Sequence, residues 1–105
     1  MRGAPLFTLD GRDGRYRLSG TAGIASARAL LEAGSTAFRG QPQVELDLSG
    51  VSAADGAGLA VLLAWLSRAR SAGQTLRFVA IPENLTALAR VCGVDSMLAS
   101  AGARA

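Results

Sequence analysis

The stretch from residue 46 to residue 65 constrains the fold most, because its apolar residues change period part-way along. Val44, Leu46 and Leu48 alternate with polar residues, which predicts a buried strand. From residue 59 onward the apolar residues fall on one face of a helix, at Leu59, Leu62, Leu63 and Leu66. A short loop of small residues joins the two segments. The sequence therefore predicts a strand leading directly into a helix, the building unit of α/β domains.

In the loop between this strand and this helix, one aspartate is followed in sequence by three small residues. Asp55 stands where a helix N-cap is expected, and Gly56, Ala57 and Gly58 follow it. A helix start with so little side-chain cover offers backbone N–H groups and a partial positive charge beyond the carboxyl end of a strand, where α/β proteins commonly bind ligands. A simpler interpretation is that the glycines only let the helix approach the sheet closely. The sequence leaves both interpretations open.

The residues before this stretch predict a hairpin and a helix. Residues 6–18 alternate around turn-forming residues at 11–14, which is typical of two antiparallel strands. Residues 22–38 predict a first helix, in which Gly34 is unfavourable and predicts an interruption. Its apolar stripe comprises Ile24, Ala27, Leu30, Leu31 and Phe38.

The residues after the central helix predict one more strand and one more helix. Residues 76–81 form a second apolar run, and Pro82 is suited to the first turn of a helix that ends at Gly93. A last apolar segment covers residues 94–98.

The order of elements predicts an α/β fold with a mixed, mostly parallel sheet that begins with a β-hairpin and continues αβαβα. The length of 105 residues suits one domain. We expect a single domain over residues 1–105, with a core at about 5–98 and a C-terminal tail at 99–105.

The composition offers few groups for catalysis. The chain has no histidine and a single cysteine, and its eight carboxylates do not cluster. We therefore expect no catalytic residues, no metal and no cofactor. Cys92 is expected to pack as a small apolar residue. A small enzyme that uses Cys92 or the carboxylates remains a rival hypothesis, although no base or triad is visible near that cysteine.

The charge pattern bears on partners and location. The net charge is +3 and every basic residue is an arginine, but the arginines are scattered and aromatic residues do not lie between them, which argues against nucleic-acid binding. A modest attraction to acidic partners or anionic lipid headgroups fits better. No apolar run is long enough to span a bilayer, and the first ten residues do not resemble a secretion signal. We expect a cytoplasmic protein that does not insert into the membrane.

A second stripe of the central helix is also largely apolar. It carries Trp65, the only tryptophan, together with an arginine, and both residue types are enriched at interface hot spots. Combined with the loop, the stripe predicts a partner-binding surface made of Ser52, Asp55, Gly56, Ala57, Gly58, Val61, Trp65 and Arg68, which the third helix extends through Glu83, Asn84 and Ala87. An isolated chain could pair with a second copy through this surface. The alternative is that Trp65 packs against the first helix within the domain.

Two motifs resemble a known family. The segments Leu46-Asp-Leu-Ser-Gly-Val and Asp55-Gly-Ala-Gly-Leu-Ala-Val-Leu-Leu-Ala-Trp are similar to the STAS domain of anti-sigma-factor antagonists and sulfate-transporter tails. Ile81-Pro-Glu-Asn-Leu, followed by Leu88-Ala-Arg, is closer to the MlaB-like members of that family. The resemblance implies a STAS fold. It also implies a non-catalytic subunit that binds the ATPase of a phospholipid-transporting ABC complex, at the inner face of the inner membrane, and helps to maintain outer-membrane lipid asymmetry.

One departure from the family pattern affects regulation. In STAS proteins the residue after the loop aspartate is usually Ser or Thr, which anti-sigma kinases phosphorylate in the antagonists; here it is Gly56. Without a hydroxyl that position cannot carry a phosphate. Ser49 and Ser52 lie upstream and are expected to make local turn hydrogen bonds instead. The rivals are an anti-sigma-factor antagonist and a protein that binds lipid directly.

Overall fold

The computed structural model describes residues 6–98 and confirms the predicted α/β fold. The elements in chain order are β1 (Phe7–Arg12), β2 (Arg15–Ala22), α1 (Ala27–Ala37), β3 (Gln43–Ala54), α2 (Gly56–Ser71), β4 (Thr75–Val79) and α3 (Glu83–Val91). A short helical turn over residues 95–98 follows α3. The expected tail at 99–105 lies outside the described residues.

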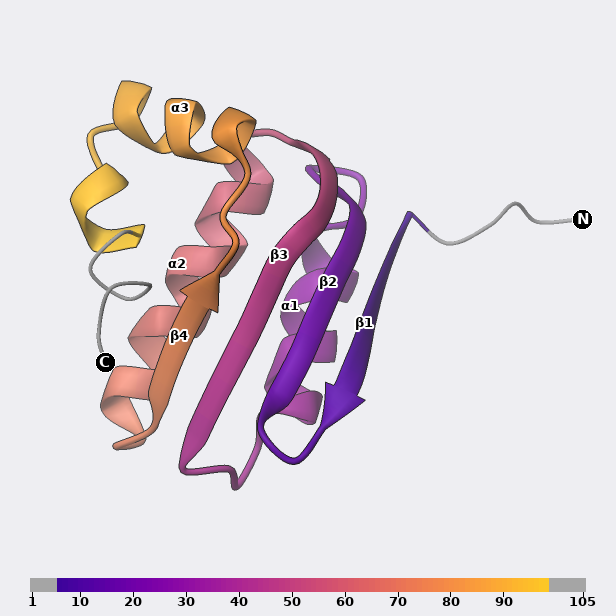
Figure 1. The fold of residues 1–105 in the computed structure, drawn as a ribbon, viewed down its shortest axis with the longest axis vertical. Helices are drawn as coiled ribbons and strands as arrows, with labels where there is room; N and C mark the ends of the chain where they lie inside the picture. Colours follow the sequence, from indigo (N-terminus) through magenta and orange to yellow (C-terminus); the bar gives the residue numbers. More distant parts are fainter. Residues whose placement is uncertain (1–5, 99–105) are drawn as a thin grey trace, which may run out of the picture.

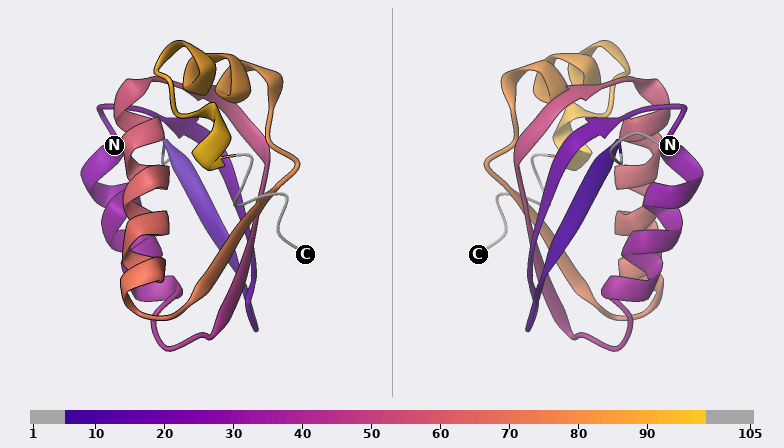
Figure 2. Two further views of the ribbon diagram at one scale, coloured as in Figure 1. Left: turned by 90° about the vertical axis from the view of Figure 1, so that its left-hand side faces the viewer. Right: turned by 90° about the vertical axis from the view of Figure 1, so that its right-hand side faces the viewer.

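The four strands form one sheet in the order β1-β2-β3-β4. β1 and β2 pair antiparallel, whereas β3 pairs parallel with both β2 and β4. Figures 1 and 2 show α1 and α2 side by side on one face of the sheet, and α3 at the end where the parallel strands finish. The connections from β2 to β3 and from β3 to β4 therefore cross the same face of the sheet. The loops that follow β2 and β3 lie at the end near α3.

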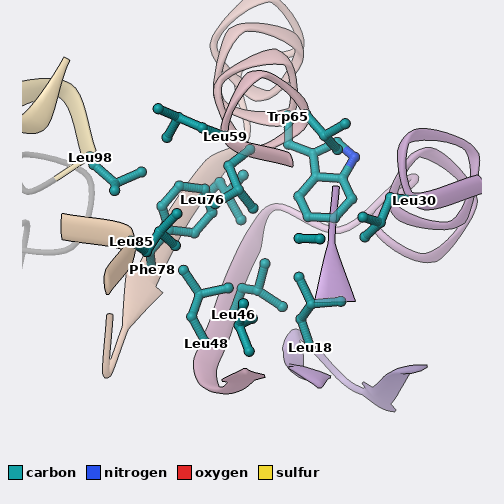
Figure 3. Packing of buried hydrophobic residues seen from close by; sticks show 14 of the residues in the cluster. Leu18, Leu30, Leu46, Leu48, Leu59, Trp65, Leu76, Phe78, Leu85 and Leu98 are labelled. Carbon is teal, nitrogen blue, oxygen red and sulfur yellow. The ribbon is translucent and has the colours of Figure 1, made fainter. Parts of the chain in front are cut away.

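The core lies between the sheet and the two long helices. Strand side chains from alternate positions meet side chains of α1 and α2, and Leu85 and Leu98 close the core below α3 (Figure 3). The most completely buried large side chains are Phe78, Leu18, Leu30, Leu46, Leu48, Leu62, Leu85 and Leu98. The predicted period of two in the strands and the apolar stripe of the central helix both supply this layer.

The opposite face of the sheet carries charged rows. Arg15 lies beside Glu45, which lies beside Arg77, and the last two form an ion pair with 2.9 Å between nitrogen and oxygen. In the next row Arg17 stands beside Asp47. Pairs of opposite charge across neighbouring strands stabilise a sheet by a few tenths of a kcal/mol to about 1 kcal/mol.

Two strands are longer than predicted. The apolar alternation of β3 stops at Leu48, but the strand continues to Ala54, and β2 continues to Ala22. The two extensions pair with each other through register shifts, and such shifts break the alternation from which the strand ends were predicted. Consequently the first helix begins at Ala27 instead of residue 22, and Ile24 lies outside it.

α1 and α2 approach each other closely at Gly34. The helix runs through this glycine without the predicted interruption, and the indole of Trp65 lies over it. A Cβ atom on residue 34 would stand 2.3 Å from Cε2 of that ring. The ring packs edge-on against Phe38 with 5.4 Å between centroids. Gly34 is therefore required by the packing of the two helices, which outweighs its poor helix propensity.

We predict that Gly34→Ala lowers the free energy of unfolding by about 1–3 kcal/mol, because the added methyl group displaces the indole from a filled site. Urea denaturation followed by circular dichroism measures the effect. Gly56→Ala is the matched control, since a Cβ at Gly56 meets nothing within 4 Å. Equal stability of the two variants would contradict the packing argument.

Candidate partner-binding site

Asp55 joins the two loops that open at the α3 end of the sheet. Its Oδ1 accepts hydrogen bonds from the backbone N–H groups of Ala57, at 2.9 Å, and Gly58, at 3.1 Å, so the residue is the predicted N-cap of α2. Its Oδ2 accepts from the N–H of Ile24, at 3.1 Å, in the loop between β2 and α1. One carboxylate therefore fixes both loops. The helix start is also less bare than the sequence suggested, because Asp55 already occupies two of its N–H groups.

These hydrogen bonds favour the ionised carboxylate. The N–H groups of Gly58 and Ile24 contribute most to lowering the pKa of Asp55 below its ordinary value; desolvation opposes them, and the N–H of Ala57 adds to the lowering. The carboxylate is thus charged at neutral pH, and its negative charge lies at the positive end of α2.

The glycines of the loop have different roles. Gly58 is buried, and a Cβ there would lie 1.9 Å from the carbonyl oxygen of Ala22, so this glycine permits the helix to approach β2. Gly56 is exposed and a Cβ there would meet open space. For Gly58 the simpler interpretation, that the glycine lets the helix approach the sheet, is confirmed. Gly56 instead leaves the first turn of α2 without side-chain cover.

Ile24 is the residue that the sequence pattern placed wrongly. Its spacing to Ala27 and Leu30 predicted the inner stripe of α1, but its side chain is 80% exposed. The reason is the turn before α1: Ser26 is buried, and its hydroxyl binds the backbone of Thr21 and Gly23, so the chain begins the helix only after Ser26. The bond from Ile24 N–H to Asp55 would have been hard to find, since 31 residues separate the two.

We define the Asp55 surface as Ile24, Ala25, Asp55, Gly56, Ala57 and Ala60. All are exposed except Ala57, which is half-buried. The surface is small and apolar around one protruding isoleucine, and the carboxylate of Asp55 is its only charge. Ser52 lies nearby at the end of β3, where its hydroxyl donates to the carbonyl oxygen of Gly20 on β2, at 3.2 Å.

Gly58, which is buried, and three further predicted partner residues do not belong to this surface. Val61 and Trp65 are only 6% and 3% exposed, so the alternative for Trp65, packing against the first helix, is correct. Its Nε1–H donates to the carbonyl oxygen of Leu31 at 3.4 Å. Arg68 is exposed but donates to the hydroxyl of Ser35, and it lies 13 residues beyond Asp55, or about 20 Å along α2. The stripe predicted from the sequence is therefore buried at Val61 and Trp65 and does not form a continuous exposed surface.

The third helix does offer exposed residues at the same end of the molecule. Glu83, Asn84 and Ala87 are all exposed on α3, and Figure 1 shows α3 beside the start of α2. Val91, at the end of α3, is 85% exposed. This arrangement is compatible with the predicted extension of the partner surface.

The described residues hold little catalytic chemistry. No group of three or more His, Cys, Asp or Glu side chains in residues 6–98 could hold a metal ion. Cys92 is exposed just after α3, so the expectation that it packs in the interior was wrong. Within the same residues no helix is long and apolar enough to cross a membrane.

A family model described as MlaB, STAS domain, matches residues 6–99. The chain is an MlaB-type STAS domain. No curated protein matches it. Among solved structures, it is similar to a candidate anti-sigma factor antagonist from Thermotoga maritima, with 21% identity over 88% of this chain and 82% of the other and a TM-score of 0.71. A sulfate transporter family protein from Wolinella succinogenes is 17% identical over 80% of this chain and 69% of the other, with a TM-score of 0.65.

The anti-sigma factor antagonist SpoIIAA in its unphosphorylated form is also similar. It is 13% identical over 80% of this chain and 81% of the other, with a TM-score of 0.62. At these identities the three structures establish the STAS fold alone. STAS domains of this kind are in general regulatory and not catalytic.

We predict that Asp55→Ala lowers the Tm of this STAS domain by several degrees at pH 7, because the cap of α2 and the tie to Ile24 are lost together. The folded state lowers the pKa of Asp55, so its contribution is complete above the ordinary carboxyl pKa and disappears as the pH falls through the lowered value. The difference in Tm between wild type and variant should therefore shrink below about pH 4.

Thermal unfolding over a pH series measures this difference. Glu32→Ala serves as the control, because Glu32 is an exposed residue of α1 that caps no helix. A Tm difference for Asp55→Ala that stayed constant down to the most acidic pH would contradict the proposed role of the ionised carboxylate.

Proposed function

We propose that this STAS domain binds the ATPase subunit of a phospholipid-transporting ABC complex and stabilises or activates it from outside the nucleotide site. The match to the MlaB family model supports this choice of partner. The observation that carries the proposal is the exposed Ile24 beside the Asp55-capped start of α2. The complex would maintain outer-membrane lipid asymmetry, and the ATPase would hold the domain at the inner face of the inner membrane.

Ile24 is suited to be the central contact. Transfer of an isoleucine side chain from water into an apolar pocket contributes about 2 kcal/mol, and at 80% exposure nearly all of that remains available for binding. The other exposed residues of the Asp55 surface are small apart from Asp55 itself, and Ala25, Gly56 and Ala60 have no side chain long enough to keep a partner away. The partner surface that fits is a shallow apolar recess.

The Asp55 surface is also formed before the partner arrives. The carboxylate of Asp55 fixes the Ile24 loop and the first turn of α2, and the N–H of Asp55 donates to the carbonyl oxygen of Ala22 at 3.1 Å. Binding therefore orders few groups, which reduces the entropic penalty of association. Gly56 lets the backbone of the partner come close to the first turn.

The absence of a hydroxyl at position 56 separates this function from that of an anti-sigma-factor antagonist. Gly56 has no oxygen to accept a phosphate, and the hydroxyl of Ser52 is bonded to Gly20 on the neighbouring strand and not to a local turn as expected. The backbone N–H of Ser49 donates to Oδ1 of Asp47 at 2.8 Å. We infer that assembly with the ATPase does not depend on phosphorylation of this loop.

We predict that Ile24→Asp and Gly56→Arg each weaken binding to the ATPase subunit of the ABC complex from the same organism by at least about tenfold, the equivalent of 1.4 kcal/mol. The first places a charge in the apolar contact and the second a long side chain over the helix start. Calorimetric titration with the purified ATPase measures the affinity. Met97→Asp is the control, since it charges an apolar side chain that is 49% exposed and lies on the turn over residues 95–98. Unchanged binding by both site variants would refute the proposed surface.

We further predict that incubation with a kinase-type anti-sigma factor and ATP leaves the mass of the protein unchanged, because the regulatory position has no hydroxyl. Intact-mass spectrometry measures this directly. A stoichiometric gain of one phosphate would revive the antagonist hypothesis, and Ser52→Ala would then show whether Ser52 is the acceptor.

A further inference from the structure

A second surface lies at the other end of the helical layer, where α1 and α2 finish. The two helices leave a notch of about 240 Å³ between them, lined chiefly by Gly34, Phe38, Arg39, Trp65, Arg68 and Gln74. Figure 1 shows that these helix ends lie opposite the α3 end of the molecule. The notch is therefore separate from the Asp55 surface, and neither depends on the other.

The floor of the notch is rigid and aromatic. Trp65 packs edge-on against Phe38, which packs edge-on against Tyr16 with 5.2 Å between centroids. The side-chain amide of Gln74 donates to the carbonyl oxygens of Phe38, at 2.7 Å, and Gln41, at 2.6 Å. The loop after α1 is thereby fixed to the end of α2, and hydrogen bonds within the domain hold the wall of the notch in place. The rings of Trp65 and Phe38 are themselves buried, at 3% and 5% exposed, so they form the base of the notch and its opening lies above them.

The rim of the notch is positively charged. Arg39 and Arg68 line it, and no carboxylate is among its lining residues. Both arginines are exposed, and Arg70 follows on the same end of α2. The one ion pair found in residues 6–98 joins Arg77 to Glu45 on the sheet. Arginines near helix C-termini also offset the helix dipole, but that role does not require an apolar notch between them.

We propose that this notch binds an acidic peptide segment of a partner protein, which inserts one large apolar side chain between α1 and α2 and pairs its carboxylates with Arg39 and Arg68. The volume is below the roughly 300–1,000 Å³ of small-molecule pockets, so it suits a single side chain better than a whole ligand. Of the residues that line the notch, the exposed arginines Arg39 and Arg68 belong to a type enriched at interface hot spots.

A membrane surface fits the notch less well. Insertion into a bilayer needs protruding apolar side chains next to the basic groups. The exposed large apolar side chains among the described residues are Leu6, Ile24, Val91 and Met97, and none of them lines the notch. The positive charge surrounds a concavity, which a protruding side chain can fill.

The test is selection of random short peptides displayed on phage against the immobilised full-length protein, followed by affinity measurement with the enriched peptides. We expect enrichment of peptides that combine several acidic residues with one large apolar residue. The charge-reversal variant Arg39→Glu/Arg68→Glu should bind them at least about tenfold more weakly. Arg90→Glu, on α3, is the matched control and should bind as wild type does, and so should Ile24→Asp.

Trp65 provides a readout located at the notch. Because it is the only tryptophan, its indole N–H gives a single assignable NMR signal, which an enriched peptide should shift in the wild type and not in the double variant. Circular dichroism checks that the double variant is folded. Enriched peptides without acidic residues, or equal binding by wild type and the double variant, would overturn the proposal. So would binding of anionic phosphatidylglycerol vesicles through Arg39 and Arg68 in the absence of peptide binding.

Discussion

The arrangement of this STAS domain at its proposed binding end depends on one carboxylate. Asp55 accepts hydrogen bonds from the backbone of two segments that are distant in sequence, the loop before α1 and the first turn of α2. Strand pairing brings these segments together, because Ala22 and Ala54 are register partners at the ends of β2 and β3. The carboxylate then sets their relative position, while the turn held by Ser26 leaves the side chain of Ile24 exposed. The proposed docking surface is thus a result of the backbone geometry around Asp55.

The layer architecture could be predicted from the sequence because the spacing of apolar residues indicates directly which face of a strand or helix is buried. The alternation at Val44, Leu46 and Leu48 and the helical stripe from Leu59 to Leu66 both correspond to the observed core. The N-cap at Asp55 was also predictable, since a capping aspartate makes its bonds to N–H groups two and three residues ahead. The ends of helices are equally local, and Gly73 and Gly93 both adopt positive φ just after helices, as their positions suggested.

The parts that could not be predicted depend on contacts between distant residues. The extra length of β2 and β3 comes from pairing of two segments whose own side chains do not alternate. The burial of Trp65 depends on the missing side chain at Gly34, in another helix, and no pattern within α2 distinguishes a buried tryptophan from an exposed one. Ile24 had the spacing of a core residue, but the turn held by Ser26 excludes it from the helix. A single error about where α1 begins therefore concealed the most exposed apolar side chain of the proposed site.

The contact between Gly34 and Trp65 has a consequence for how this domain can diverge. The two positions share one volume, so a larger residue at 34 is acceptable only when a smaller one replaces the indole. Related sequences should therefore vary at these two positions together, with glycine accompanying tryptophan and a bulkier residue accompanying a shorter aliphatic one. Such a paired exchange would also remove the aromatic floor of the notch between α1 and α2. Proteins that carry the exchange would therefore lack this notch.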